Sequence, residues 1–228
     1  MASNKIHRIW LGGPMPDNFV RYGYEWGLIN PDHDICEWNQ EMINDEDWIN
    51  KAVLSDMTKR SKRPGADMVA FYTHYADALC YETIYKYGGW YVNTDLKPLK
   101  PLSTLVYDKN APAFANEDDI HAVNMAMYCP ANDPLFANII ELLPIRYFGM
   151  PGAFMNATTG VQLIMQALSI YNGPLTRFNK NVFNPIHFSE FGYGAEPNIN
   201  REYSNETVAV HLWGHRTNQR GQRILENE

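Results

Sequence analysis

The 228-residue sequence predicts an α/β fold in which a mostly parallel β-sheet is flanked by helices. The first observation is that short apolar runs alternate with longer amphipathic segments. We expect strands at 6–11 and 34–38, and helices at 16–28 and 39–54. The second observation is a segment from 66 to 87 without proline or glycine, which precedes another short strand. Strands and helices that alternate in this way form parallel sheets through crossover connections.

Local signals support each of the N-terminal elements. The run 6–11 is rich in β-branched and aromatic residues, and Gly12-Gly13-Pro14 breaks it. Pro16 occupies the first turn of the next helix, where aromatic residues recur at helical spacing. The sequence Asn30-Pro31-Asp32-His33 predicts the turn before the second strand.

The stretch from 66 to 102 is the one around which the rest of the chain is organised. Its helix has a wide apolar face, so we expect it to be buried. Gly88-Gly89 ends the helix, because glycine adopts a positive φ without strain. Trp90-Tyr91-Val92 predicts a short strand. The two prolines of 97–101 prevent this strand from continuing as a regular central strand.

Polar residues follow where this strand ends, in the sequence Asn93-Thr94-Asp95. In an extended chain Asn93 and Asp95 point to the same side and Thr94 points away. Two oxygen-bearing side chains at the carboxyl end of a strand are well placed to meet a ligand. Asp77 lies within the preceding helix, with no Lys or Arg three or four residues away. A buried acid there needs hydrogen bonds or a cation.

The second half of the chain has weaker periodicity. Short strands are expected at 113–115 and 122–128, with an acidic turn between them. The further expectations are a helix from Asp133 to about Leu143, an irregular segment at 145–157, a helix at 158–171, loops around a short strand at 182–199 and a final strand at 208–211.

Composition excludes several classes of protein. A hydrophobic content of 45% allows a substantial core, and the net charge of −7 argues against a nucleic-acid-binding surface. The basic run 59–63 is interpreted as a solvated or mobile loop, with an active-site flap as the alternative. We expect one domain over residues 1–215, followed by a polar tail at 216–228.

The cysteines and the N-terminus bear on the cellular compartment. Cys36, Cys80 and Cys129 are isolated and lack metal-type spacing, which indicates reduced thiols. The N-terminus lacks the apolar core of a signal peptide, and no run approaches the roughly eighteen apolar residues of a membrane span. The expectation is a soluble, cytoplasmic protein without a membrane span.

The order of these motifs resembles the sugar-binding region of the DXD-containing glycosyltransferases, family 32 and its relatives. Their pattern is roughly S-D-x-x-R-Y-x-x-L-x-x-x-G-G-x-Y-x-D-x-D, and the chain matches it at Asp77, Tyr81, Gly88, Gly89, Tyr91 and Asp95. It departs at Cys80, where the family has arginine, and at Asn93, where the family has the first aspartate of DXD. The opening strand 5–12 and the C-terminal His-x-Trp at 211–213 extend the resemblance over most of the chain.

This resemblance implies a GT-A-type, Rossmann-like fold with a mixed, mostly parallel sheet. It also implies a retaining, hexosyl-type transferase that uses a nucleotide sugar, here a UDP-sugar. Mn²⁺ or Mg²⁺ would bridge the donor diphosphate, with Asp95 and His211 as implied protein ligands. Asp77 and Asp95 are the implied catalytic residues. The implied donor-binding residues are Trp10, Leu11, Gly12, Asp77, Asn93, Thr94 and Trp213.

Asn124, Thr159 and Gly160 resemble weaker family positions, and Glu117 and Asp118 are further candidates because they lie in an acidic turn after a strand. The acidic turn at 117–119 either orients a sugar or is simply solvated, and Thr159 is equally well explained as an N-cap. For His211 a structural role in the core remains an alternative, as does a structural capping role for Asp77. No residue stands out as a nucleophile, and a glycosidase with Asp77 and Asp95 as its acid pair explains the Gly-Gly strand arrangement less well.

Two hypotheses follow for the function. The first is an active but divergent glycosyltransferase, whose acceptor (a glycan, lipid or protein) contacts the loops at 145–157 and 180–205. The second is a catalytically silent module that binds a nucleotide sugar or a glycan. Asn93 and Cys80 motivate the second, because asparagine lacks the charge of aspartate and cysteine lacks the donors of arginine.

Overall fold

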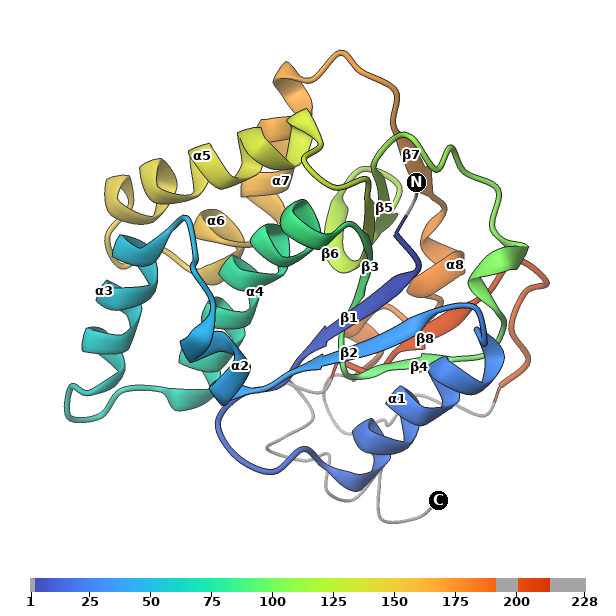
Figure 1. Ribbon diagram of the computed structural model, residues 1–228, viewed down its shortest axis with the longest axis horizontal. Coiled ribbons are helices and arrows are strands. Elements are labelled where there is room, and N and C mark those ends of the chain that lie inside the picture. Colours follow the sequence, from blue (N-terminus) through green and yellow to red (C-terminus); the bar gives the residue numbers. More distant parts are fainter. Residues whose placement is uncertain (1–2, 192–200, 214–228) are drawn as a thin grey trace.

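A six-stranded sheet runs through the centre of the computed structural model, which describes residues 3–191 and 201–213 (Figure 1). Its strand order is β2-β1-β3-β6-β5-β7. The strands are β1 (Lys5–Ile9), β2 (Asp34–Trp38), β3 (Gly89–Val92), β5 (Ala113–Asn116), β6 (Ala122–Cys129) and β7 (Thr176–Phe178). The pairs β1–β2, β1–β3 and β5–β7 are parallel, and β6 is antiparallel to both β3 and β5. The predicted fold class, a mixed and mostly parallel sheet flanked by helices, is confirmed.

Helices cover both faces of this sheet (Figure 1). One face carries α3 (Lys51–Ser61), α4 (Met68–Tyr87), α5 (Pro134–Gly149), α6 (Met155–Thr158) and α7 (Val161–Ile170). The other face carries α1 (Asp17–Ile29) and α8 (Lys180–Phe183). The remaining helical segments are α2 (Gln40–Asp45), η1 (Leu102–Thr104) and η2 (Phe188–Phe191). Side chains alternate along β3, so the strand contributes to the core on both faces of the sheet. Trp90 and Val92 pack in the core under α1, and Tyr91 packs in the core under α4.

A second, two-stranded sheet lies beside the first. It pairs β4 (Leu96–Pro98) antiparallel with β8 (Ala209–His211), so that Leu96 lies opposite His211. The final strand was expected, and the prolines after Asp95 do keep 97–101 out of the central sheet. The pairing of β4 with β8 was not expected, and it brings the C-terminal strand next to the end of β3.

Helix α4 confirms the predicted start and stop but not the predicted burial. The Asp67 side chain caps its start by accepting a hydrogen bond from the Ala70 N–H at 3.0 Å, and Gly88 ends it with φ +64°. Only the second half, from Ala78 to Ile84, is buried. The expectation of a buried helix was therefore wrong for the first half, which lines a pocket instead.

The single helix expected at 39–54 is two helices, α2 and α3. The break has a tertiary cause, because the buried Glu82 carboxylate of α4 accepts the backbone N–H groups of Ile49 and Asn50. These bonds satisfy free N–H groups at the start of α3. The interpretation of 59–63 as a loop was also wrong in part, because α3 continues to Ser61 and Arg60 pairs with Asp56 at 2.6 Å.

Helix α5 continues past its expected end at Leu143, although Pro144 lies inside it. Proline lacks the N–H that would bond to the carbonyl four residues earlier, at Ile140. The Asn50 side chain donates to this carbonyl at 3.0 Å and replaces the missing bond. The segment expected to be irregular, 145–157, is consequently part helical, in α5 and α6, and the helix expected from 158 begins at Val161.

The remaining differences lie toward the C-terminus. Strand β7 was missed, and the segment from 180 holds α8 and η2 rather than a strand within the part that the structure describes. Residues 192–200 of the predicted loop region and the predicted tail at 216–228 lie outside the described residues. All three cysteines are free thiols. None of the described helices combines the length and the apolar character needed to cross a membrane.

The Gly88-Gly89 junction gives a first prediction. Gly89 has φ +99°, and a Cβ there would lie 2.5 Å from the carbonyl oxygen of Lys5 on β1. Gly89→Ala should therefore lower the free energy of unfolding by about 3 kcal/mol, through backbone strain and overlap together. Gly65→Ala is the matched control, because Gly65 also has a positive φ (+75°) but nothing within 4 Å of the added Cβ. Urea denaturation that gave equal losses for both variants would contradict this account.

Candidate functional site

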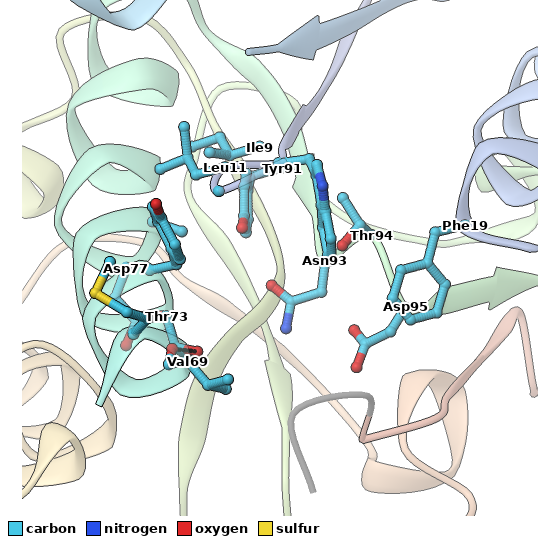
Figure 2. A pocket seen from close by; sticks show the side chains of 15 residues that line it. Ile9, Leu11, Phe19, Val69, Thr73, Asp77, Tyr91, Asn93, Thr94 and Asp95 are labelled. Atoms are coloured by element: carbon cyan, nitrogen blue, oxygen red, sulfur yellow. Dashed lines mark hydrogen bonds between the residues drawn. The ribbon is translucent and has the colours of Figure 1, made fainter. Parts of the chain in front are cut away.

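A pocket of about 370 Å³ opens at the carboxyl ends of β1 and β3 (Figure 2). These two strands are parallel neighbours, so their ends meet at one edge of the sheet. The first half of α4 forms the facing wall. The lining residues are Ile9, Trp10, Leu11, Gly12, Phe19, Met68, Val69, Tyr72, Thr73, Ala76, Asp77, Tyr91, Asn93, Thr94 and Asp95.

The segment after β1 supplies the three residues expected at a nucleotide. Trp10, Leu11 and Gly12 all line the pocket. Gly12 has φ +90°, and the Tyr72 ring of α4 lies where a Cβ would be, so only glycine fits here. The Trp10 indole N–H donates to the Gly13 carbonyl at 3.0 Å, and its ring meets Phe19 edge-on at 5.8 Å between centroids. This end of the pocket is aromatic and apolar.

The segment after β3 is a tight turn rather than the extended chain that was assumed. The Leu96 N–H donates to the Asn93 carbonyl at 3.1 Å. The expected result nevertheless holds, because the side chains of Asn93 and Asp95 both point to the same side of the pocket (Figure 2). Thr94 also lines the pocket, so the three predicted residues lie together.

His211 reaches this turn through the β4–β8 pairing. Its Nε2 lies 3.2 Å from Oδ1 of Asp95 and 3.4 Å from Nδ2 of Asn93. The histidine is buried, and its Nδ1 has no hydrogen-bond partner among the described residues. The Trp213 ring lies 4.5 Å from the imidazole, but Trp213 is packed in the core, where its indole N–H donates to the Ile186 carbonyl at 3.0 Å. Trp213 therefore lies behind His211 and not in the pocket wall.

Asp95 and His211 fit a divalent cation. Ligands about 2.1 Å from an octahedral ion lie about 3 Å apart, which is close to the separation of Oδ1 and Nε2. A carboxylate oxygen and an imidazole nitrogen are both suited to Mn²⁺. No cluster of three or more His, Cys, Asp or Glu side chains forms a metal site within residues 3–191 and 201–213. Any cation held here would take its other ligands from bound oxygens or water.

Asp77 lies on the α4 wall in a small polar cluster. Asn124 of β6 donates to its Oδ1 at 2.8 Å, and the Thr159 hydroxyl donates to its Oδ2 at 3.2 Å. Burial raises the pKa of Asp77 to about 7, although both hydrogen bonds oppose the shift. Asn124 and Thr159, two of the weaker sequence candidates, are thus brought together with Asp77. The buried Cys80 thiol adjoins them, with Sγ 3.8 Å from Nδ2 of Asn124.

None of the weaker candidates is among the residues that line the pocket, and the remaining three are Glu117, Asp118 and Gly160. Burial raises the pKa of Glu117, while His187 and His211 oppose the shift, so this carboxylate lies within electrostatic range of the histidine side of the site. Asp118 caps its own turn and accepts a hydrogen bond from His121 Nδ1 at 2.7 Å. Gly160 is the N-cap of α7, one residue after Thr159.

Several lining residues were not singled out from the sequence. Val69, Tyr72, Thr73 and Ala76 follow the spacing i, i+3, i+4, i+7 along one face of α4. Extending that face from Asp77 toward the N-terminus would have found them. Arg8 was also missed. It lies beneath the site, and no local pattern marks it.

Comparisons with known proteins agree with this geometry. Residues 16–112 match the family described as "Glycosyltransferase sugar-binding region containing DXD motif". A search of curated protein sequences found no significant match. Among solved structures, the PaToxG glycosyltransferase is similar with a TM-score of 0.55 and 18% identity, over 73% of this chain and 69% of that chain.

Two further structures are similar. One is the UDP-bound glycosyltransferase domain of the YGT toxin, with a TM-score of 0.56 and 10% identity, over 84% of this chain and 82% of that chain. The other is a glycosyltransferase involved in glycosylation of the major capsid of PBCV-1, with a TM-score of 0.54 and 9% identity, over 96% and 98%. The chain thus has the α/β fold of GT-A glycosyltransferases and carries a match to their sugar-binding region.

The raised pKa of Asp77 predicts a pH-dependent stability. Between its ordinary pKa of 3.8 and about 7, the folded protein keeps a proton on Asp77 that the unfolded chain has lost. The contribution of Asp77 to stability therefore falls as the pH rises through this window and is constant above it. Asp77→Asn should raise the melting temperature at pH 8 and change it little at pH 4. At about 1.4 kcal/mol per pKa unit, the gain has an upper limit of about 4 kcal/mol.

Asp118→Asn is the control of opposite sign. Burial raises the pKa of Asp118, but hydrogen bonds from His121 and Ile120 outweigh it and hold the pKa at about 2. This substitution should lower the melting temperature at pH 8. If Asp77→Asn changed the melting temperature equally at pH 4 and pH 8, the assigned protonation of Asp77 would be wrong.

Proposed function

We propose that the protein is a glycosyltransferase that moves a sugar from a nucleotide-sugar donor to an acceptor with the help of a divalent cation. The observation that carries the proposal is a contact behind the pocket wall: Oδ1 of Asp95, which lines the pocket, lies 3.2 Å from Nε2 of the buried His211, and Asp77 lies in the facing wall. Residues 1–215 would form the catalytic domain. A structural Asp77 and a core His211 are the alternatives. They explain each residue separately, but not why Asp77 and Asp95 line the same pocket while His211 contacts Asp95.

The charge of the pocket supports a requirement for metal. Its described lining contains two acids, Asp77 and Asp95, and no lysine or arginine. A donor diphosphate would be repelled by Asp95 unless a cation lay between them. Asp95 and His211 would hold Mn²⁺ or Mg²⁺, which stabilises negative charge on the departing diphosphate. Within the described part of the chain, Asp95 and His211 are the two proposed ligands, and phosphate oxygens and water would complete the coordination.

The nucleoside would occupy the aromatic end of the pocket. Leu11 and Gly12 offer backbone that a base and ribose can approach closely, with Trp10, Phe19 and Tyr72 around them. Asn93 keeps an oxygen acceptor for a ribose hydroxyl and adds an amide donor. A UDP-sugar is the proposed donor. The presence of UDP in the similar YGT toxin domain supports this choice.

The sugar would lie against the Asp77 cluster. Asp77, Asn124 and Thr159 come from α4, β6 and the C-terminal end of α6, and together they supply the acceptors and donors that sugar hydroxyls need. Cys80 takes the place of the family's arginine, so this subsite lacks that cation. Retention and the hexosyl class rest on the resemblance to family 32. The equivalence of Asn93 to the first aspartate of the DXD motif rests on the same resemblance.

The acceptor contacts are proposed at 145–157 and at 180–205. A cytoplasmic location is proposed from the three isolated, free cysteines. The silent-module alternative is favoured by one observation: Cys80 is buried, and its neighbours Asp77 and Asn124 already satisfy one another.

Loss of the metal ligand is the direct test. Nucleotide release from a panel of UDP- and GDP-sugars would be measured with Mn²⁺ and with EDTA. Wild-type protein should release nucleotide from one donor only with metal, and Asp95→Asn should lower the rate by about 100-fold or more, because it removes the charge and keeps the shape. Asp34→Asn, an exposed acid at the opposite end of the parallel strands, should leave the rate unchanged. Metal-independent release, or full activity in Asp95→Asn, would refute the proposal.

Asn93→Asp separates the enzyme from the silent module. The added carboxylate lies beside Asp95 and His211, and charged hydrogen bonds are roughly twice as strong as neutral ones. An active wild type should therefore need about tenfold less Mn²⁺ after this change, in a titration of nucleotide release against metal concentration. A silent wild type that binds UDP and gains turnover only as Asn93→Asp would establish the alternative.

A further inference from the structure

Arg8 is a buried cation directly beneath the pocket, although it does not line it. Its side chain is fully buried. Nη1 pairs with the Glu37 carboxylate of β2, while Nη2 donates to the carbonyls of Phe19 at 2.8 Å and Thr94 at 2.9 Å. Phe19 and Thr94 both belong to the pocket lining (Figure 2). One guanidinium therefore connects β1, the start of α1 and the turn after β3.

The surroundings of Arg8 are adapted to its charge. Burial lowers the pKa of Arg8, and the negative charges of Glu37 and Asp95 counteract this. The Glu37 side chain is 41% exposed, so the pair has one end at the surface. Gly23 of α1 faces both partners, and a Cβ at that position would overlap the guanidinium and the carboxylate. The fold thus leaves space for this one interaction.

The turn that presents Asp95 is held from behind by three different donors. Arg8 binds the Thr94 carbonyl, the Leu212 N–H binds the Asp95 carbonyl at 3.1 Å, and the Trp26 indole binds the Leu96 carbonyl at 3.0 Å. Of these three donors only Arg8 is charged, and only Arg8 also donates to the carbonyl of Phe19, which lines the aromatic end of the pocket. Its hydrogen bonds fix the spacing between the aromatic end of the pocket and the Asp95 carboxylate.

We propose that Arg8 is a positioning residue that sets the Asn93–Asp95 turn for metal and nucleotide binding. The inference rests on the proposed function. It assigns to Arg8 a role through the Thr94 and Phe19 carbonyls, without contact to the donor. The planar fork of arginine serves three acceptors from one centre. Lysine carries its charge on a single nitrogen and cannot reach both carbonyls and Glu37 in the same way.

The experiment compares Arg8→Lys with His7→Ala. His7 is the adjacent residue on β1 and is equally buried, but its Nε2 donates to the Gly88 carbonyl at the other end of β3. Calorimetry would measure UDP affinity with and without Mn²⁺, and NMR would follow exchange of the Leu96 amide, which donates within the turn. Arg8→Lys should weaken metal-dependent UDP affinity by about tenfold or more and speed up Leu96 exchange. His7→Ala should lower the melting temperature with neither effect.

A second variant tests the same role in case the Arg8→Lys protein does not fold. Arg8→Met combined with Glu37→Gln removes both charges, which buried ion pairs often tolerate. It should give the same loss of metal-dependent affinity. Wild-type affinity and slow Leu96 exchange in a folded Arg8 variant would overturn the positioning role alone, as would equal losses in His7→Ala. A wild type without metal-dependent UDP binding would overturn the proposed function, and this inference with it.

Discussion

Burial of the Arg8 guanidinium imposes a condition that three neighbouring elements have to meet. A charge without a partner in the interior would be strongly destabilising, so Glu37 and two backbone carbonyls must converge on it. Gly23 lacks a side chain at the point where α1 crosses the pair. The same contacts determine where the start of α1 and the end of β3 lie relative to one another. The pocket between these elements therefore depends on an interaction outside its lining.

The position of β3 explains why the site forms at this edge of the sheet. On one side β3 runs parallel to β1, and on the other it runs antiparallel to β6. The parallel neighbour places the segment after β1 beside the Asn93–Asp95 turn, and β6 brings Asn124 to Asp77. Gly89 permits the close approach of β1, because a side chain there would overlap the Lys5 carbonyl. The two strand pairings therefore place an aromatic, apolar end and the polar surroundings of Asp77 at the same edge of the sheet.

The two acids of the pocket have different surroundings and suit different tasks. Asp95 lies within electrostatic range of the Arg8 guanidinium, and its Oδ1 is 3.2 Å from Nε2 of His211. Asp77 is partly buried and has neutral hydrogen-bond partners, and desolvation raises its pKa to about 7. A carboxyl group in that range can form hydrogen bonds to sugar hydroxyls in either protonation state. The difference between the two residues comes from their surroundings, since both are aspartates.

The fold class, the helix stop at Gly88 and the polar cluster after β3 could be predicted from the amino-acid sequence, because they depend on periodicity, backbone freedom and spacing within one stretch. The resemblance to the DXD-containing glycosyltransferases added His211, Asn124 and Thr159 to the candidate site residues, but it did not show which residues they contact. Only the tertiary structure decided that His211 meets Asp95 and that Asn124 and Thr159 meet Asp77. It also decided the break before α3, the continuation of α5 past Pro144 and the role of Arg8. Each of these rests on a hydrogen bond or ion pair between residues far apart in the chain, and local patterns carry no information about such partners.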